Sequence, residues 1–255
     1  MKIRVLGSHN LETRSTRHTC FLVNDALAID AGSLVTALDD TEIAGLRTIL
    51  LTHHHFDHTR DLPTLGLLRL AAPHAIDVHG LPITLQQVTA HLMDGEVYPD
   101  FTKERGGDGP RYRFSAVAPD RELALGRLTV APVPMPHSVP SVGYVLKVDD
   151  DAIAFTGDTG GGLLAMLTSG VTPRVLFVDM TFPNRMLDAG KVSGHLTPRL
   201  LHQQLEGALS EGTPVPPIVA VHRGVGFEDE LLAELAQVSR DIGVDIEPGY
   251  EGMTL

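Results

Sequence analysis

The sequence predicts an α/β fold in which two mixed β-sheets pack face to face and helices cover them outside. In each half of the 255-residue chain, short apolar runs of strand type accompany longer segments with helical spacing. Such sets of strands flanked by helices suit two sheet layers between two helix layers. A hydrophobic content of 43% is sufficient for a sizeable core. We expect one domain over residues 1–255, because one α/β domain can occupy this length.

The first sheet is expected early in the chain. Its strands are predicted at residues 2–6, Cys20–Val23, Leu27–Ile29, Thr48–Leu51 and Ile76–His79. Leucines at roughly helical spacing predict helices at Thr59–Ala72 and Pro82–Met93. Residues 94–113 show no periodicity and predict a long irregular insertion. Tyr98 and Phe101 in this insertion either pack it onto its own domain or stack on a substrate base.

The second half returns to strand patterns after the insertion. Strands are predicted at Arg113–Ala118, Arg127–Val133, Val142–Val148, Ala152–Phe155, Val175–Val178 and Ile218–Val221. Helices are predicted at Gly162–Ser169, Pro198–Leu209 and Phe227–Ile242. Together these segments predict a second sheet with its own helices.

Four histidines and one aspartate follow the strand predicted to end at residue 51, all within seven residues. Alternate side chains of an extended backbone point the same way, so His53 and His55 should point together while His54 points away. Two imidazoles can then bind one metal ion. Asp57 and His58 are adjacent and cannot share that direction, so they suit a second ion. The spacing therefore predicts half of a two-metal site.

Further ligands must come from elsewhere in the chain, and three residues qualify. His137, Asp158 and His222 each follow a segment that reads as a strand, where a side chain can emerge at the edge of a sheet. Taken singly, His137 and Asp158 would be ordinary turn residues. Because Cys20 is the only thiol, a closed thiolate site is excluded, and the predicted site keeps room for water.

The ordered set resembles the ligand pattern of the metallo-β-lactamase superfamily: His53, His55, Asp57, His58, His137, Asp158 and His222. Three further motifs resemble the class II cyclic-nucleotide phosphodiesterases and the related ribonuclease Z. They are Ile29-Asp30-Ala31-Gly32-Ser33, His137-Ser-Val-Pro-Ser-Val-Gly143 and Ser193-Gly194-His195-Leu196-Thr197-Pro198. The sequence departs from the class II pattern at Phe56, where leucine is usual. It also has Asp179-Met180-Thr181 where that pattern has an acidic residue, cysteine and serine.

This resemblance implies a four-layer αββα sandwich with two divalent metal ions, for which zinc is our first expectation and manganese the alternative. The first ion would take His53, His55 and His137, and the second Asp57, His58 and His222. Asp158 would bridge them at roughly 3.5–4 Å separation, and a shared water would become the hydroxide nucleophile. Asp57 would orient that hydroxide.

Three other residues receive roles on the same basis. Asp30 is expected to accept a hydrogen bond from a metal-ligating side chain, although its Asp-Ala-Gly context also suits a plain turn. His195 is expected to protonate the leaving alkoxide, although by itself it also suits a residue near a helix N-terminus. Arg223, beside His222, is expected to meet the charge of a substrate phosphate.

Together these features predict a metal-dependent phosphodiesterase for small 3′,5′-cyclic nucleotides. The alternatives are a ribonuclease Z-like nuclease, a thioester or lactone hydrolase, and a non-catalytic metal-containing protein that binds nucleotide. A net charge of −12 without a block of Lys and Arg disfavours a long nucleic acid as partner. With no signal peptide or membrane span in the sequence, we expect a cytoplasmic protein. The superfamily often dimerises, so a homodimer is expected.

Overall fold

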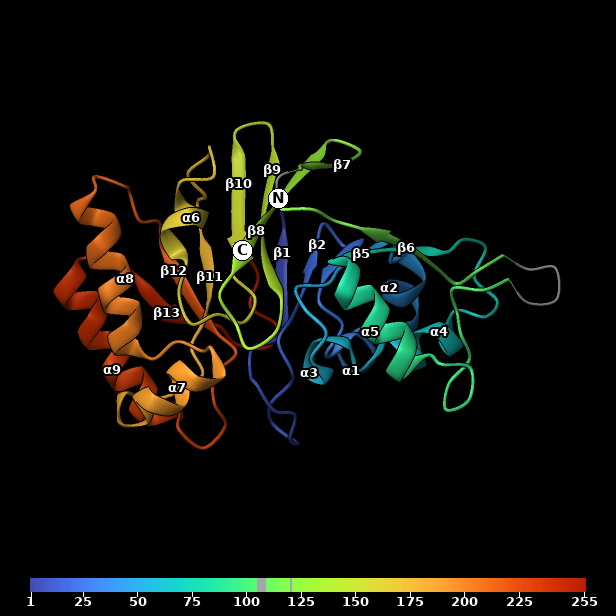
Figure 1. Ribbon diagram of the computed structural model, residues 1–255, viewed down its shortest axis with the longest axis horizontal. Coiled ribbons are helices and arrows are strands. Elements are labelled where there is room, and N and C mark those ends of the chain that lie inside the picture. The colour runs from blue at the N-terminus through green and yellow to red at the C-terminus, as the bar shows by residue number, and fades with distance from the viewer. Residues whose placement is uncertain (105–108, 120) are drawn as a thin grey trace. The chain divides into compact units, whose positions relative to one another are not determined.

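The computed structural model describes residues 1–104, 109–119 and 121–255, and the chain divides into two compact units (Figure 1). The N-terminal unit comprises residues 2–8, 12–117 and 251–255, and the C-terminal unit comprises residues 1, 9–11 and 118–250. Each unit has one mixed sheet, its own helices and its own hydrophobic core. The prediction of one domain over residues 1–255 stays a prediction.

The N-terminal unit contains a six-stranded sheet in sequential order. Its strands are β1 (Ile3–Gly7), β2 (Cys20–Val23), β3 (Leu27–Ile29), β4 (Thr48–Leu50), β5 (Ile76–Gly80) and β6 (Tyr112–Ala116). The first three strands pair antiparallel, and β3 to β6 pair parallel. Ile29 lies opposite Leu50 in the β3–β4 pair, so the chain leaves both strands at the same edge of the sheet.

The described residues of this unit form the helices α1 (Leu34–Ala37), α2 (Asp40–Gly45), α3 (Phe56–Thr59), α4 (Leu62–Leu68) and α5 (Pro82–Leu92). The helix predicted over Thr59–Ala72 is shorter, because α3 ends at Thr59 and α4 ends at Leu68. Neither α1 nor α2 was expected. They span four and six residues, too few to show a helical period, although α2 begins with a capping box between Asp39 and Glu42.

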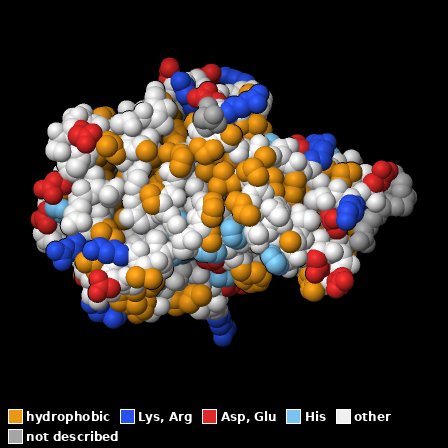
Figure 2. Space-filling model, in the orientation of Figure 1, with side chains coloured by type: hydrophobic (Ala, Val, Ile, Leu, Met, Phe, Trp, Pro, Cys, Tyr) orange, Lys and Arg blue, Asp and Glu red, His pale blue; other side chains and the backbone are white. Residues whose placement is uncertain are grey.

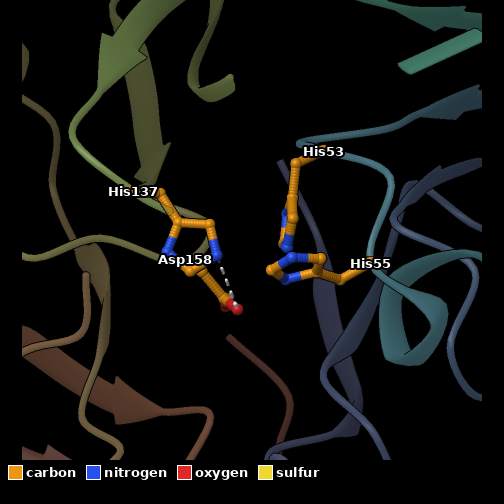
Figure 3. Close-up of side chains that lie close together, drawn as sticks. All are labelled: His53, His55, His137 and Asp158. Atoms are coloured by element: carbon orange, nitrogen blue, oxygen red, sulfur yellow. Dashed lines mark ion pairs between the residues drawn. The ribbon is translucent and has the colours of Figure 1, made fainter. Parts of the chain in front are cut away.

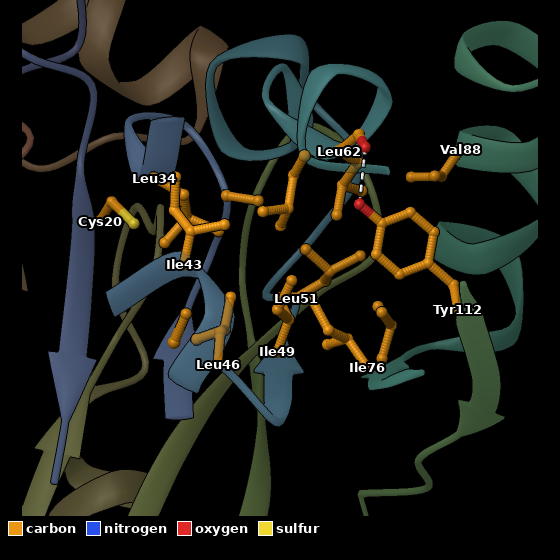
Figure 4. Packing of buried hydrophobic residues seen from close by; sticks show 14 of the residues in the cluster. Cys20, Leu34, Ile43, Leu46, Ile49, Leu51, Leu62, Ile76, Val88 and Tyr112 are labelled. Atoms are coloured by element: carbon orange, nitrogen blue, oxygen red, sulfur yellow. Dashed lines mark hydrogen bonds between the residues drawn. The ribbon is translucent and has the colours of Figure 1, made fainter. Parts of the chain in front are cut away.

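Figure 4 shows part of the core of the N-terminal unit, and this core includes Phe101 near the start of the predicted insertion. Phe101 is 2% exposed, and its ring meets the edge of Tyr112 with centroids 6.1 Å apart. A Cβ at Gly66 would lie 2.5 Å from the Phe101 ring, so a glycine is needed there. The Tyr112 hydroxyl donates to the Leu62 carbonyl at 2.6 Å. Residues 105–108 of the predicted insertion lie outside the described residues.

The C-terminal unit contains a seven-stranded sheet ordered β13-β12-β11-β10-β9-β8-β7. The strands are β7 (Leu123–Leu125), β8 (Leu128–Met135), β9 (Ser141–Val148), β10 (Asp151–Phe155), β11 (Leu176–Asp179), β12 (Ile218–Val221) and β13 (Ile246–Pro248). β10, β11 and β12 are parallel neighbours, whereas β9 pairs antiparallel with both β8 and β10. Consequently β8, β10, β11 and β12 all run in one direction, and their C-terminal ends meet at one edge of the sheet.

The helices of this unit are α6 (Leu163–Leu167), α7 (Leu187–Ser193), α8 (Pro198–Ser210) and α9 (Glu228–Ile242), with a 3₁₀ turn at Asn184–Met186. Thr197 caps α8. The buried side chains of α8, Leu201, Leu205 and Ala208, recur at helical spacing in the core. α8 and α9 pack side by side (Figure 1). Within the described ranges, no helix has both the length and the apolar character needed to cross a bilayer.

Candidate metal centre

The N-terminal unit brings three imidazoles together just beyond the end of β4. The His53 ring lies 4.6 Å from the His55 ring and 4.2 Å from the His58 ring between centroids. α3 begins directly after His55, so Asp57 and His58 leave the backbone in helical rather than extended directions. The Asp57 Oδ2 atom lies 3.5 Å from the Nε2 atom of His58. Figure 3 shows His53 and His55 leaving the same loop.

Asp30 orients this cluster from the end of the neighbouring strand β3. Its backbone is in the left-handed region at φ +59°, which is unusual for a buried aspartate. Its carboxylate accepts hydrogen bonds from the Thr52 backbone at 2.8 Å and from the His58 Nδ1 at 2.7 Å. Because the His58 proton is held on Nδ1, the lone pair of this imidazole lies on Nε2. This is the contact that the resemblance implies for Asp30.

In the C-terminal unit, three predicted ligands follow strands that end at one edge of the sheet. Asp158 comes after β10 and is 2% exposed. Its Oδ2 atom lies 3.9 Å from the His137 Nε2, drawn in Figure 3, and its Oδ1 atom lies 3.4 Å from the His222 Nε2. Both distances are long for hydrogen bonds. Each carboxylate oxygen thus faces a different imidazole, as a carboxylate shared by two cations would require.

Both of these imidazoles are also held through Nδ1. His137 Nδ1 donates to the Gly194 carbonyl at 2.8 Å. Gly194 has φ +74°, and a Cβ there would lie 2.8 Å from the His137 Cα, so only glycine allows this approach. His222 Nδ1 lies 2.8 Å from the hydroxyl of Thr181, which itself donates to Asp179 at 2.6 Å. The hydroxyl therefore accepts from His222, so the lone pair of this imidazole lies on Nε2.

Asp179, the last residue of β11, holds His195 beside this set. It is fully buried, and its Oδ2 atom accepts from the His195 Nδ1 at 2.8 Å and from the Thr159 backbone at 3.0 Å. Burial disfavours the charge on both groups, but their mutual attraction prevails. The pKa of His195 is therefore raised above its ordinary value, and the pKa of Asp179 is lowered. Burial lowers the pKa of His137.

The side chain of His195 lies among the predicted ligands of its unit. Its ring stacks on His222 at 5.3 Å between centroids, and it meets the His137 ring at 4.9 Å. Ligand atoms of Asp158, Asp179, His195 and His222 all lie within 4.8 Å of one another. A protonated imidazole held here can deliver a proton to a group bound at the edge of the sheet.

Sequence reasoning left Asp179 and Thr181 out of the site. They stand in the triplet Asp179-Met180-Thr181, noted only as a departure from the class II pattern. A usable signal existed, because Asp179 follows an apolar strand run just as Asp158 and His222 do. That signal gains meaning only once β11 is placed between β10 and β12.

The donor sets of both units fit divalent cations. His58, His137 and His222 each have Nδ1 engaged by an oxygen acceptor, so the lone pair lies on Nε2, and each Nε2 atom lies 3.4–3.9 Å from a carboxylate oxygen that could share a cation with it. Neutral imidazole combined with carboxylate suits zinc and similar borderline metals.

The three predicted substrate contacts occupy different environments. Phe101 lies in the core, which favours the packing alternative, whereas Tyr98 is half-buried against that core. Arg223 is 6% exposed and donates to the carbonyls of Ala220 and Gly249. Phe101 and Arg223 thus have structural contacts, and the contact of all three residues with substrate stays a prediction.

Comparisons with known proteins place the chain in a family. No curated protein matches it. Among solved structures, it is similar over 100% of its length to unliganded yeast PDE1 (TM-score 0.84, 16% identity) and to YhfI from Bacillus subtilis (0.75, 17%). It also resembles human tRNase Z, short form (0.71, 15%), and it covers 98% of each of these three chains. These likenesses confirm the predicted fold class. The sequence model of the beta-lactamase superfamily domain matches residues 29–215, more than half of the chain, which therefore belongs to this superfamily of metal-dependent hydrolases.

Proposed function

We propose that the protein is a dinuclear-metal phosphodiesterase that hydrolyses small 3′,5′-cyclic nucleotides to nucleoside monophosphates. The observation that carries this proposal is the pairing of His195 with the fully buried Asp179, with an Nδ1 to Oδ2 distance of 2.8 Å. Hydrolysis of a 3′,5′-cyclic phosphodiester releases a strongly basic alkoxide, which needs a proton donor. A thioester releases a weakly basic thiolate, so His195 would have no corresponding task in a thioester hydrolase.

The ligand sets of the two units are proposed to act together on two ions. His53, His55 and His137 would hold the first ion, and Asp57, His58 and His222 the second, with Asp158 shared. Zinc is the proposed metal and manganese the alternative, because the donors are imidazole nitrogens and carboxylate oxygens. When bound, such ions supply a low-pKa water and neutralise the charge of a phosphoryl group.

The chain's own residues would do the rest. His195 donates through Nδ1 to Asp179, so its Nε2 proton is the one it can pass to the departing oxygen. The same carboxylate keeps the imidazole ring oriented and favours its protonated form. Asp57 would accept a hydrogen bond from the attacking water and aim its lone pair. Asp30 would fix the orientation of His58.

Charge favours a small substrate over a tRNA. The chain carries −12, and Lys and Arg side chains are scattered over the face drawn in Figure 2 without forming a continuous basic patch. A tRNA enzyme must neutralise several phosphates, whereas a cyclic nucleotide carries one negative charge. The structural likeness extends both to PDE1 and to a tRNase Z, so the fold is compatible with the ribonuclease Z-like alternative. A non-catalytic nucleotide-binding protein would need no proton donor.

A leaving-group comparison tests the proposal. His195→Ala should keep its metal ions but lose about 10²- to 10⁴-fold in kcat on a cyclic nucleotide, because the alkoxide leaves unprotonated. A nitrophenyl phosphodiester, whose leaving group needs no proton, should lose much less. Equal losses on both substrates would show that His195 positions the substrate instead.

The substrate class is tested by assaying a panel of cyclic nucleotides and a precursor tRNA at increasing salt. We expect hydrolysis of cyclic nucleotides with weak salt dependence. Efficient, salt-sensitive tRNA cleavage with no activity on any cyclic nucleotide would favour the ribonuclease Z-like alternative. The proposed homodimer is tested separately by sedimentation of the purified protein.

A further inference from the structure

A pocket of about 460 Å³ lies within the N-terminal unit beside α3, the helix that carries Asp57 and His58. This volume falls in the range of sites that take small molecules. Its walls include the side chains of Phe56, Val97 and Tyr98, and its polar edge includes Glu12, Arg60 and Asp61. None of these six was assigned to the metal site.

Two apolar side chains in the pocket wall are unusually exposed to solvent. Phe56 is 60% exposed although it stands between His55 and Asp57, and Val97 is 75% exposed. Isolated exposed apolar residues are common, but two large ones facing one pocket mark a surface suited to an apolar ligand.

The segment that carries Val97 is a turn fixed by hydrogen bonds. The Asp94 carboxylate accepts from the backbone of Glu96 and Val97 at 2.9 Å each, and the Gly95 backbone donates to the Tyr98 carbonyl at 2.9 Å. Tyr98 packs against the core of the unit. The pocket wall is therefore held by the fold before any ligand binds.

The polar edge is electronegative. Arg60 Nη2 donates to Glu12 at 2.7 Å, and Arg60 Nε donates to Asp61 at 3.1 Å, so two carboxylates surround one guanidinium. Asp61 also accepts from the Val35 backbone at 2.7 Å. A carboxylate has about four lone-pair directions, and Glu12 uses one of them in these bonds. This edge suits a ligand that donates N–H groups. It would repel a phosphate group.

Resting on the proposed function, we infer that this pocket holds the nucleobase of the substrate, with its ring against Phe56 and Tyr98 and its N–H groups toward Glu12. A purine is the class of base that fits, since adenine and guanine both offer amino donors at one edge of a large planar ring. Phe56 follows His55 directly, so the base would be anchored one residue from the metal ligands.

The test reads binding without turnover. The chain has no tryptophan, so Val97→Trp places a single fluorophore at the pocket. Val192→Trp, at an 86% exposed position in the C-terminal unit, is the matched control. We expect adenosine and guanosine to quench the Val97→Trp fluorescence saturably and the control only linearly. Adding Phe56→Leu should raise the apparent Kd on the order of tenfold, because base stacking is lost.

The outcomes separate this inference from the proposed function. Identical linear quenching of both tryptophan variants would overturn the pocket assignment, even if wild-type protein hydrolyses cyclic nucleotides. Saturable nucleoside binding without hydrolysis of any cyclic nucleotide would keep the pocket and reject the proposed reaction. Displacement of nucleoside by inorganic pyrophosphate, which has no N–H donor, would also contradict the inference.

Discussion

The two ligand sets of this protein are built in different ways. In the N-terminal unit, His53, His55, Asp57 and His58 lie within six consecutive residues at the junction of one strand and one helix. In the C-terminal unit, the corresponding ligands His137, Asp158 and His222 follow three separate strands, β8, β10 and β12, which share only their direction. A local turn is enough to arrange the first set, whereas the second depends on the pairing of the whole sheet. The first set should therefore tolerate changes elsewhere better than the second.

The largest effect is expected at Asp158, which faces an imidazole with each of its oxygens. Asp158→Asn keeps the shape of the side chain but removes its charge. We expect the loss of at least one bound ion and of activity by more than about 10³-fold, measured by metal analysis and phosphodiester hydrolysis. His54→Ala, with a histidine predicted to point away, is the control and should keep both ions. Full metal content in Asp158→Asn would refute the shared-ligand role.

The two supporting aspartates allow a direct comparison of the sets. Asp30 bonds His58 and, through the Thr52 hydroxyl, supports His53. Asp179 bonds His195 and, through Thr181, supports His222, so the two aspartates differ in that Asp179 holds the proposed proton donor. Asp30→Asn should weaken metal binding roughly 10- to 100-fold, as is typical for residues that orient ligands.

Asp179→Asn should cause a similar loss of metal affinity. It should also lower kcat at saturating metal, because His195 loses the carboxylate that orients it. Measuring metal affinity and metal-saturated kcat for both variants separates the effects. If Asp30→Asn lowers kcat at saturating metal as much as Asp179→Asn does, the two aspartates do not differ in supporting a proton donor.

A pH effect is expected in the N-terminal unit at His79. Burial lowers the pKa of this imidazole, so the folded state keeps it neutral. Below pH 6.5, the ordinary pKa of histidine, the unfolded chain takes up a proton at His79 that the folded chain does not. The free energy of unfolding therefore decreases as the pH decreases, by up to about 1.4 kcal/mol per pH unit. His79→Gln should reduce the difference in unfolding free energy between pH 7.5 and 5.5, measured in urea.

The smallest effect concerns the cap of α2 and tests whether the two units unfold together. Asp39 accepts from the Glu42 backbone at 2.8 Å, and Asp39→Ala should lower stability by about 1 kcal/mol. If the chain is one cooperative domain, as predicted, hydrogen exchange of the slowest amides should accelerate equally in both units. Acceleration confined to the N-terminal unit would show that the units open separately.

The sequence predicted the long elements and much of the site because both have local causes. Helices α5, α8 and α9 repeat their apolar residues over enough turns to show a period, and the strand ending near Leu50 belongs to a short apolar run. Helices α1, α2 and α7 and strands β7 and β13 span three to seven residues, which is too short for such a signal. Similarly, the helix predicted to continue to Ala72 ends at Leu68, because tertiary packing decides helix ends.

What the sequence determined by itself is the metal-binding character of the chain. The His53 to His58 spacing needs only a strand end and a helix start, and ligand chemistry follows from the residue types. Only the tertiary structure decided the partnerships of Asp179. Its place in the sheet, between the strands that precede Asp158 and His222, depends on parallel pairing across long stretches of chain. Strand order is a non-local property, so a buried aspartate could be recognised as the support of His195 only after the strands were placed.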